Sequence, residues 1–597
     1  MWVGTTADRF SEKRFKERIR FVSIIFAIGF TGILLRLFYL QVMKGDDFAL
    51  VSESNRTQTI FLGAPRGNFF DRNNKPLVTN RPSWSLMYSG ATETDLTQEN
   101  MVRRLRPFLE SFTSRWERRL KQAFKSKQLV RLMEDVPTPT AFGIRETGDL
   151  LPGLRMEMEF RRDYPNGIQG IQLLGYLAEI DDQELKDDFW FARKSGDLIG
   201  KMGLEKILDS QLRGHDGGML IEVDSVGRLK RVIRELPYQR GSSIHLTLDS
   251  HLQRVAQDAL AETSTQRGAV VLMDVETGAV LTWVSSPAFD PSVSLAEVVT
   301  DANLPFFDRV YKGAYPPGSL FKIITAMAAL ESGLVRTKDK VKCLGHITLK
   351  DKRLKERRYG CWRRHGVVDF WKAMSESCDS YFYTISQKIG SQAIYEMGSR
   401  FGLGEPVQDA LPGENPGVLP NPSWKRKRGL GGWSTGDTLN FSIGQGFLTS
   451  TPLQMAVMMA GLSTHGKTPR PYVISRIYSE AGITRFETRP SFLKPIKLKS
   501  TTWENILDAT RMVVEKGTGK ASAIPYLVVH GKTGTAQNPH GNDHAWFLAA
   551  AGYPHEPLKY SVCVFVENGG NGGSAAAPIA RRVLKAALPP RSFGETL

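Results

Sequence analysis

The sequence predicts an α+β protein in three parts: one N-terminal transmembrane helix, a middle region of mixed strands and helices, and a C-terminal domain with a five-stranded antiparallel sheet flanked by helices. Three observations support this fold class. One long apolar segment lies near the N-terminus, the composition changes near residues 240–243, and five strand-like segments are split into two groups by a long helical stretch. With 597 residues, 41% of them hydrophobic, the chain is long enough for several domains with sizeable cores.

The apolar segment covers residues 21–43, and about 23 residues are enough to cross a hydrocarbon core of roughly 30 Å. Arg36 interrupts it, but an arginine near a helix end can reach the membrane interface, where Phe38 and Tyr39 also fit. Residues 1–20 carry more Lys and Arg than Asp and Glu, which predicts a cytoplasmic tail and an extracytoplasmic bulk of the chain. The alternative is a cleaved signal peptide, although no small-residue cleavage site follows the apolar run.

Residues 44–240 form the middle region. Strand-like pieces such as 57–62 alternate there with charged helical stretches such as 101–127, and no catalytic constellation is present. We therefore expect a scaffold without chemistry of its own.

The C-terminal domain, residues 241–597, contains the five strand-like segments. Two of them flank a Glu-Thr-Gly turn and predict a hairpin, and two others flank a loop rich in Asn, Pro and Gly. The segments are 268–274, 278–284, 530–536, 545–550 and 560–566, and a helix at 575–587 follows them. Together they can form one antiparallel sheet with helices on its faces.

Ser319 is the first candidate for chemistry. It lies three residues before Lys322 and heads an apolar stretch that ends at Gly333, which predicts a buried helix. Residues at i and i+3 share a helix face with Cβ atoms roughly 5 to 6 Å apart, so the Lys322 amine can reach the Ser319 hydroxyl. Free N–H groups at a helix start can also stabilise an anion. The spacing predicts an activated serine.

Two further motifs follow in the chain: Ser377-Cys378-Asp379 and Lys532-Thr533-Gly534-Thr535. With these three motifs in this order, the chain resembles the penicillin-recognising serine enzymes, and more closely the class B penicillin-binding proteins of the elongation type. The resemblance extends to supporting motifs along nearly the whole chain, namely Arg66-Gly67, Asp71-Arg72, Arg161-Arg162-Asp163-Tyr164-Pro165, Gly200, Gly203-Leu204-Glu205, Leu411-Pro412-Gly413-Glu414 and Gly444-Gln445-Gly446. At the third position of the second motif the family usually has Asn, whereas this chain has Asp379. An Asp at this position resembles the elongation-type subgroup.

The resemblance implies a peptidoglycan D,D-transpeptidase that cross-links stem peptides during cell-wall elongation. Ser319 would attack the D-Ala-D-Ala carbonyl, Lys322 would act as general base, and Ser377 would pass the proton to the leaving amine. Which group removes the Ser319 proton stays open, because an ionised Asp379 near Lys322 and Lys532 favours charged lysines.

The resemblance also implies the substrate-binding groups. Lys532 and Thr533 would hold the substrate carboxylate, the N–H groups of Ser319 and Thr535 would form the oxyanion hole, and Gly534 would let the strand approach the substrate. Residues 44–240 would be the pedestal (dimerisation-type) domain. The chemistry would need no cofactor and β-lactams would inhibit it. A D,D-carboxypeptidase side activity is implied too, and the expected partners are a SEDS-type (RodA-like) glycosyltransferase and the elongation machinery.

Three other classes remain as alternatives. A β-lactamase would hydrolyse its acyl ester rapidly, but a membrane anchor and a large middle region argue against it. A β-lactam receptor would need a cytoplasmic output domain, for which about 20 residues are too few. A non-catalytic scaffold that activates a glycosyltransferase would fail to react with penicillin.

The cysteines suggest a metal site. Cys343, Cys361 and Cys378 lie close together in the chain, and His365 follows Cys361 by four residues. Three thiolates and one imidazole suit tetrahedral zinc, which would brace the active-site wall at Ser377. A disulfide, favoured by an oxidising exterior, and unlinked thiols are the alternatives. Cys563, in an apolar strand, is expected to be a core residue.

The net charge is +17, with basic runs at residues 350–358 and 425–428. Such surfaces suit anionic phospholipid or anionic cell-wall polymer, although most of these charges are expected to be solvated. Nucleic acid is not expected as a partner, because an exported domain would not meet it and neither run alternates with stacking aromatic residues.

Overall fold

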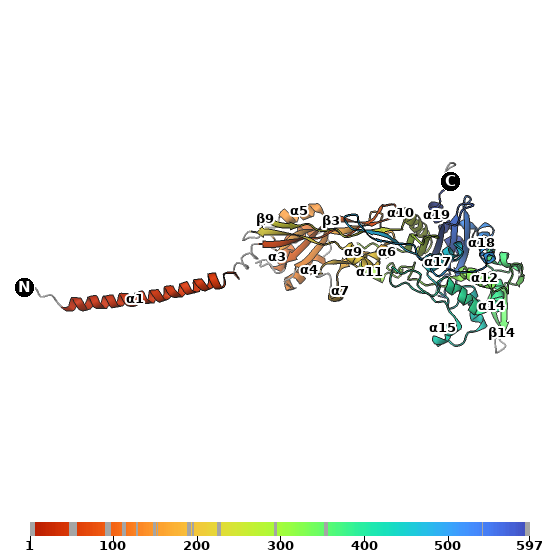
Figure 1. Ribbon diagram of the computed structural model, residues 1–597, viewed down its shortest axis with the longest axis horizontal. Coiled ribbons are helices and arrows are strands. Elements are labelled where there is room, and N and C mark those ends of the chain that lie inside the picture. The colour runs from red at the N-terminus through yellow and green to blue at the C-terminus, as the bar shows by residue number, and fades with distance from the viewer. Residues whose placement is uncertain are drawn as a thin grey trace, which may run out of the picture. The chain divides into compact units, whose positions relative to one another are not determined.

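The computed structural model describes residues 6–46, 57–89, 97–109, 115–126, 129–146, 151, 153–187, 193, 196–223, 229–291, 295–350, 356–539 and 541–591. The chain divides into two compact units (Figure 1). The first comprises Met1–Ala64 and His215–Gln239, and the second comprises Pro65–Gly214 and Arg240–Leu597.

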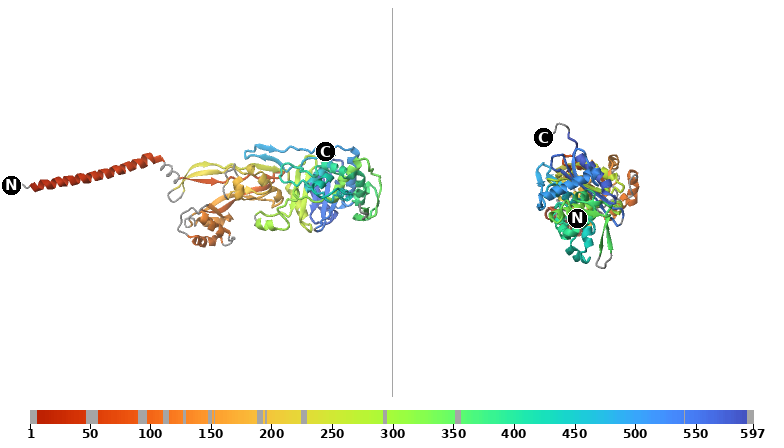
Figure 2. Two further views of the ribbon diagram at one scale, coloured as in Figure 1. Left: turned by 90° about the horizontal axis from the view of Figure 1, so that it is seen from below. Right: turned by 90° about the vertical axis from the view of Figure 1, so that its right-hand side faces the viewer.

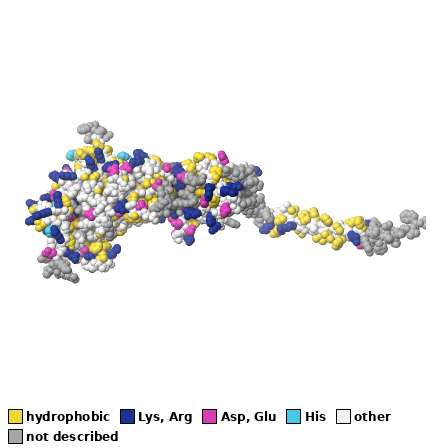
Figure 3. Space-filling model, turned by 180° about the vertical axis from the view of Figure 1, so that it is seen from behind, with side chains coloured by type: hydrophobic (Ala, Val, Ile, Leu, Met, Phe, Trp, Pro, Cys, Tyr) yellow, Lys and Arg dark blue, Asp and Glu magenta, His cyan; other side chains and the backbone are white. Residues whose placement is uncertain are grey.

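The first unit contains the N-terminal helix α1 (Thr6–Phe38), which continues into a π-helical turn at Tyr39–Met43. Within the described residues, Phe15–Met43 is the one helical segment long and apolar enough to cross a membrane. From Phe15 to Tyr39 its apolar side chains are exposed (Figure 3), as expected for a helix that faces lipid. The guanidinium of Arg36 lies 5.4 Å from the ring centre of Tyr39, which fits an interfacial position for both side chains.

A three-stranded antiparallel sheet completes the first unit. Its strands are β1 (Thr57–Leu62), β8 (Gly217–Val223) and β9 (Leu229–Leu236), with β8 in the centre. The predicted strand at 57–62 is therefore present, and its partners lie far along the chain, from the pair Leu62↔Gly217 to the pair Thr57↔Glu222.

The second unit has a seven-stranded sheet in the order β18-β17-β10-β2-β3-β4, with β5 also paired to β3. The strands are β2 (Phe69–Phe70), β3 (Pro76–Ser89), β4 (Leu129–Val136), β5 (Leu154–Asp163), β10 (Ser243–Leu246), β17 (Ile474–Tyr478) and β18 (Thr484–Glu487). Segments on both sides of residue 240 thus share one sheet (Figure 2).

Three helices cover part of this sheet: α3 (Gln98–Leu109), α4 (Arg115–Ser126) and α5 (Thr138–Glu146). Their apolar faces form a core of their own with strand residues such as Leu86 and Tyr88. Of the charged stretch predicted at 101–127, the helices α3 and α4 are described, while residues 110–114 and 127 lie outside the described residues.

Buried ion pairs explain three of the supporting motifs. Glu205 is fully buried and accepts from Arg66 Nη2 at 2.9 Å and from Arg162 Nε at 2.7 Å. Arg66 also pairs with Asp209 at 2.8 Å. Removing one partner of such a network costs about 3 to 5 kcal/mol, because the other charge stays buried without compensation. Residues from three motifs that lie far apart in the sequence therefore form one buried ion-pair network.

The smaller elements around this network are two short strands that pair with each other and four short helices. They are β6 (Leu177–Glu179) with β7 (Leu198–Gly200), and α6 (Ile171–Leu174), α7 (Asp182–Asp187), α8 (Gly203–Ile207) and α9 (Asp209–Leu212).

The five-stranded sheet has the order β12-β11-β21-β20-β19, and every neighbouring pair is antiparallel. This confirms the predicted sheet. The strands are β11 (Gly268–Asp274), β12 (Val280–Ser286), β19 (Val528–Ala536), β20 (His544–Gly552) and β21 (Tyr560–Val566). Strand β12 begins after Gly278, because that glycine has φ +85° and a Cβ there would lie 2.2 Å from the Arg470 carbonyl oxygen.

Both faces of this sheet are covered, so every residue of β20 and β21 is buried. Helices α10 (Ser250–Ala261) and α19 (Gly572–Ala587) contact one another and share a core with residues of one face. On the other face, α12 (Lys322–Glu331), α14 (Asp379–Arg400) and α17 (Pro452–Ser463) contribute to the largest core. Helix α18 (Ser500–Glu515) packs on the edge strand β19.

The remaining elements surround the motifs. The helices are α11 (Leu295–Thr300), the 3-10 turn η3 (Gly318–Phe321), α13 (Phe370–Ser375), α15 (Pro422–Lys427), α16 (Thr435–Ser442) and the 3-10 turn η4 (Lys520–Ser522). Two antiparallel strand pairs lie between α12 and α13, namely β13 (Val341–Cys343) with β16 (Gly366–Val368) and β14 (His346–Lys350) with β15 (Glu356–Gly360).

Candidate active site

Ser319 lies in the 3-10 turn η3, directly before α12. The turn is held in place by tight backbone packing. Gly318 N–H donates to the Gly444 carbonyl at 2.9 Å, and a Cβ at Gly318 would lie 2.6 Å from the carbonyl oxygen of Thr535. With φ +55°, Gly318 also adopts a backbone conformation that side chains disfavour. The first motif therefore packs directly against the third.

The hydroxyl of Ser377 joins all three motifs. It accepts from Lys322 Nζ at 3.1 Å and from Lys532 Nζ at 2.9 Å, and both lysines are fully buried. Lys322 also donates to the Ser377 carbonyl at 2.9 Å and to Asp379 Oδ1 at 2.7 Å. The structure thus brings together Lys322, Ser377, Asp379 and Lys532, with Ser319 in the turn that leads into Lys322.

Ser377 itself has an unusual backbone. Its φ of +55° is left-handed, a conformation that costs a non-glycine residue free energy and is concentrated at functional sites. Strong hydrogen bonds from two ammonium groups to its side chain offset that cost.

The expected hydrogen bond between Lys322 and Ser319 is not formed. Within the described part of the chain, the donors of Lys322 go to Ser377 and Asp379, and the Ser319 hydroxyl has no hydrogen-bond partner. A carboxylate is a stronger acceptor for an ammonium group than a neutral hydroxyl, so Asp379 outcompetes Ser319.

Burial lowers the pKa of Lys532 well below its ordinary value, and the nearby Lys322 lowers it further. Asp379 acts in the opposite direction but does not reverse the shift. Asp379 thus favours the charged form of Lys532 in the expected direction, but desolvation outweighs this attraction.

Strand β19 carries the third motif at an edge of the sheet. A Cβ at Gly534 would lie 3.0 Å from Leu320 Cγ, from the Pro317 carbonyl oxygen and from Trp546 Cβ. Gly534 thus allows β19 to pack on the turn that carries Ser319. Thr535 is partly exposed beside this contact, and its carbonyl accepts from Gln445 Nε2 at 3.5 Å.

Thr518 is a site residue that the sequence analysis missed. Its hydroxyl lies 2.6 Å from the hydroxyl of Thr533, and its N–H donates to the Ser375 carbonyl at 3.1 Å. It therefore links the loop of the second motif to the third motif. The available signal was its position between Gly517 and Gly519, since a Cβ at Gly517 would lie 2.1 Å from the Ser375 carbonyl oxygen.

The predicted metal ligands also come together. The ligand atoms of Cys343, Cys361, His365 and Cys378 all lie within 4.8 Å of one another. His365 Nδ1 is 3.6 Å from Cys343 Sγ and 3.4 Å from Cys361 Sγ. No disulfide joins the four cysteines of the described chain, and Cys563 lies in the sheet core, outside the cluster.

The two distances from His365 Nδ1 to the thiols fit a zinc ion. Zn–S bonds of about 2.3 Å and Zn–N bonds of about 2.0 Å place tetrahedral ligands roughly 3.5 to 3.8 Å apart. On the other side of the imidazole, His365 Nε2 is buried without a hydrogen bond and lies 4.0 Å from Glu376 Oε2, which also pairs with Arg363 at 2.7 Å. A carboxylate in this position is typical behind a metal-bound histidine.

Known proteins are similar to this chain in sequence and in fold. Residues 268–585 match the penicillin binding protein transpeptidase domain, and residues 62–246 match the penicillin-binding protein dimerisation domain. The chain is 32% identical over 596 residues to the peptidoglycan D,D-transpeptidase MrdA of Acinetobacter baumannii, covering 94% of this chain and 87% of that protein.

Two solved structures are similar over most of the chain. Penicillin-binding protein 2 of Helicobacter pylori, in complex with MreC, has a TM-score of 0.73 at 25% identity, covering 89% of this chain and 99% of that one. A chain from a peptidoglycan synthase complex that coordinates polymerization and crosslinking has a TM-score of 0.70 at 27% identity, covering 97% of this chain and 100% of that one.

Proposed function

The chain belongs to the penicillin-binding protein 2 (MrdA) family of peptidoglycan D,D-transpeptidases, and on this premise we propose that Ser319 is its nucleophile. As a member of this family it is a serine-type enzyme of cell-wall synthesis that acts on peptidoglycan and binds β-lactams. The observation that carries the assignment is the pair of hydrogen bonds from Lys322 and Lys532 to Ser377, which joins the three motifs in one site.

In the proposed reaction, Ser319 Oγ attacks the carbonyl of the terminal D-Ala-D-Ala amide while its proton passes to Lys322. The C–N bond then breaks, and the departing D-Ala amine takes a proton through Ser377, leaving an ester on Ser319. An amine from a neighbouring stem peptide attacks this ester, forms the cross-link and returns the proton to Ser319. The Lys322–Ser377–Lys532 chain of hydrogen bonds supports proton transfer between these groups.

Lys532 and Thr533 are proposed to bind the substrate carboxylate from β19, and Gly534 to keep that strand close to Ser319. The N–H groups of Ser319 and Thr535 are proposed to form the oxyanion hole. The tight packing of the Ser319 turn on Thr535 supports this pairing. Each such donor typically lowers the barrier by roughly 2.7 to 4 kcal/mol.

Mass spectrometry of the intact protein after penicillin treatment tests the nucleophile. The wild type should gain the mass of one penicillin and keep it, and Ser319→Ala should gain none. Ser332→Ala is a matched control, because Ser332 is exposed just beyond α12 and should leave labelling unchanged. Labelling of Ser319→Ala would refute the assignment, and rapid loss of the adduct would indicate a β-lactamase.

We further propose that Cys343, Cys361, His365 and Cys378 hold a structural zinc ion. The ion would neutralise the thiolates and join the β13–β16 strands to the second motif, and it would take no part in bond making. The donor set and the spacing of its atoms support this assignment. Elemental analysis of the purified protein should find one zinc per chain.

The membrane arrangement is also proposed. Residues 1–20 would be cytoplasmic, 21–43 would span the plasma (inner) membrane, and the pedestal domain (44–240) and transpeptidase domain (241–597) would be extracytoplasmic. The basic bias before the apolar helix supports this orientation. A C-terminal fusion to a reporter that is active only outside the cytoplasm should be active.

The enzyme is proposed to act in cell elongation and cell-shape maintenance with a SEDS-type (RodA-like) glycosyltransferase. The similar chain in a peptidoglycan synthase complex supports such a partner. Copurification of the full-length protein with that glycosyltransferase tests the association.

A further inference from the structure

A basic surface lies on α15 (Pro422–Lys427) and the residue after it. Arg426, Lys427 and Arg428 are exposed, and none of them has an acidic partner among the described residues. Lys425 is different, because it is buried and donates to Asp437 at the start of α16 at 2.7 Å. The helix is therefore anchored through one cation while the next three face solvent.

This surface, named here the α15 surface, adjoins the catalytic motifs. The rings of Trp424 and Phe447 lie 5.5 Å apart, and Lys425 Nζ lies 5.5 Å from the centre of the Phe447 ring. Phe447 follows Gln445 by two residues, and Gln445 donates to Thr535 of the third motif. The α15 surface is thus one short segment away from the cleft.

Helix α16 makes a second connection to the same cleft. Its N-terminal turn holds Lys425 through Asp437, and near its C-terminus the Ser442 carbonyl accepts from Thr325 of α12 at 2.8 Å. Asp437 and Ser442 are separated by a helical rise of only about 7.5 Å, so α16 connects the anchor of the α15 surface closely to the helix that follows Ser319.

The β14–β15 hairpin adds a further cation to this region. A Cβ at Gly436 would lie 2.2 Å from the hydroxyl of Tyr359, so the hairpin packs against the first turn of α16. Arg357 is exposed and points to the same side of β15 as Tyr359, because side chains alternate along a strand. Of the basic run at 350–358, residues 351–355 lie outside the described residues.

Cross-linking needs two peptides, and in the proposed reaction the three catalytic motifs bind the first. Its cations, Lys322 and Lys532, are buried and already bonded to Ser377. The second peptide must bring its amine to the ester on Ser319 from outside the cleft. Stem peptides carry free carboxylates, so this second strand is anionic, and exposed guanidinium and ammonium groups without acidic partners complement it.

We propose that the α15 surface, together with Arg357, binds carboxylates of the acceptor stem peptides and so directs the second peptidoglycan strand to the acyl-enzyme. This inference rests on the proposed function and deepens it by naming where the second substrate binds. The surface acts before the second step and is not needed for the acylation of Ser319.

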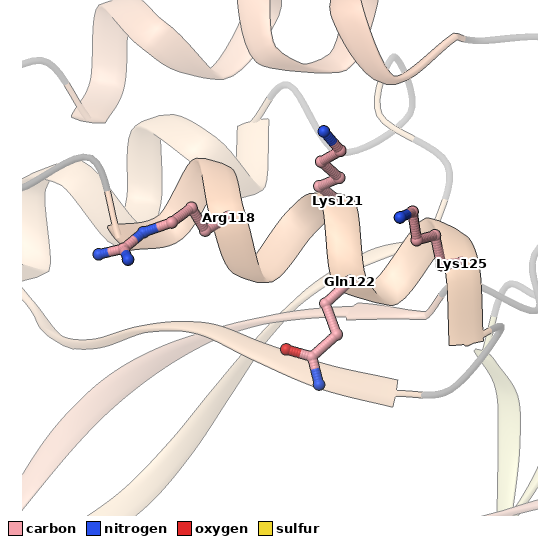
Figure 4. A pocket seen from close by; sticks show the side chains of 4 residues that line it. All are labelled: Arg118, Lys121, Gln122 and Lys125. Carbon is pink, nitrogen blue, oxygen red and sulfur yellow. The ribbon is translucent and has the colours of Figure 1, made fainter.

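The test compares two triple charge reversals in the full-length protein. Arg426→Glu/Lys427→Glu/Arg428→Glu changes the α15 surface. Arg118→Glu/Lys121→Glu/Lys125→Glu is the matched control on α4, where these exposed side chains and Gln122 line a shallow hollow on another basic helix (Figure 4). Both variants change the net charge by the same amount, so a general charge effect appears in both.

Three measurements are made on each variant: acylation by fluorescent penicillin, the dependence of cross-linking on acceptor concentration, and cosedimentation with isolated peptidoglycan. For the α15 variant we expect acylation within about twofold of wild type, an acceptor KM raised about tenfold, and a similar loss of cosedimentation. The α4 variant should behave like wild type in all three. Rising salt should raise the acceptor KM of the wild type toward that of the α15 variant.

The inference is overturned if the α15 and α4 variants have the same acceptor KM. It is also overturned if the α15 variant loses binding to phosphatidylglycerol vesicles while it keeps binding to peptidoglycan, which would assign the surface to the membrane. If the reversal abolishes acylation, the milder Arg426→Gln/Lys427→Gln/Arg428→Gln variant decides by the same criterion. Wild-type protein that is not acylated at Ser319 would refute the proposed function instead, which separates the two failures.

Discussion

Ser377 and Cys378 are neighbours in the chain, but Ser377 belongs to the catalytic motifs and Cys378 to the cysteine–histidine cluster. The two regions differ in how their charged and polar groups are balanced. In the cleft, the Ser377 hydroxyl accepts from two lysines and Asp379 supplies a negative charge, so the polar groups satisfy one another. In the cluster, Cys378 joins two more thiols and an imidazole within 4.8 Å, and no cationic side chain is among them.

The two regions therefore differ in what balances their charged groups. The polar side chains of the catalytic motifs balance one another, whereas in the cluster the proposed zinc ion would supply the positive charge that holds the thiolates together. Changes in the cleft should therefore alter the chemistry with little loss of stability. Changes in the cluster should first loosen the loop and alter the chemistry only through it. The following predictions test this contrast, ordered by the expected effect on acylation.

Lys532→Met should have the largest effect and should lower the acylation rate about 10³-fold, because the variant loses the buried amine that is proposed to bind substrate and transfer protons. The same variant should be more stable than the wild type at neutral pH by on the order of 1 kcal/mol, since the buried ammonium group is replaced by an apolar side chain of similar length.

The gain in stability should depend on pH. Because the folded-state pKa of Lys532 is lowered, the unfolded chain binds more protons than the folded chain between that pKa and 10.5. The penalty of burying Lys532 is therefore full below the folded-state pKa and disappears as the pH rises toward 10.5. Urea unfolding of both proteins at neutral and alkaline pH measures this, and a constant difference would contradict it.

Ser377→Ala should lower the acylation rate about 10²-fold, because the acceptor shared by Lys322 and Lys532 is removed. Ser375→Ala is the control from the same loop, since that hydroxyl donates to the Lys372 carbonyl and should leave the rate unchanged. Stopped-flow acylation with a chromogenic β-lactam gives both rates. Equal rates in the two variants would show that Ser377 has no special part in the cleft.

Cys361→Ser should reduce bound zinc, lower the melting temperature and slow acylation about tenfold. Cys563→Ala is the control, because this buried thiol lies in β21, outside the cluster, and should keep its zinc. Elemental analysis and thermal unfolding report on the loop, and penicillin labelling reports on the cleft. A wild type free of zinc, with full activity in Cys361→Ser, would refute the metal site.

Thr518→Val should have the smallest effect. The variant keeps the shape of the side chain but removes the hydroxyl partner of Thr533, and one hydrogen bond of about 1 kcal/mol net corresponds to roughly fivefold. If Thr518 orients Thr533 for carboxylate binding, KM should rise more than kcat falls, and Thr518→Ser should restore both. Loss of stability without this pattern would indicate a structural role only.

Sequence reasoning predicted the five strands of the central sheet to within a few residues, because short apolar runs and turn signals are local properties of the chain. It did not predict that strands on both sides of residue 240 share a second sheet, such as β2 with β10. That pairing depends on which strand edges meet after folding, and the local sequence of neither strand predicts it.

The candidate site shows the same division. The residue types that carry the chemistry were recognisable as three short motifs, but Thr518 carried only the signal of its two glycine neighbours. The acceptor chosen by Lys322 was expected to be Ser319 and is instead Ser377 and Asp379. Ser319 and the second motif compete for the amine of Lys322. Which of them accepts its hydrogen bonds depends on the charge of Asp379 and on where the backbone places the second motif.

By itself, the sequence determined the apolar helix, the strand and helix segments, the three motifs and the set of thiols and imidazole. Each of these depends on residue identity and on neighbours a few positions away. The tertiary structure alone decided that Lys532 and Ser377, 155 residues apart, share a hydrogen bond, and that burial lowers the pKa of Lys532. It also decided that Gly534 provides the space in which the Ser319 turn packs on β19. These outcomes depend on desolvation and close contact between distant segments, which exist only once the chain has folded.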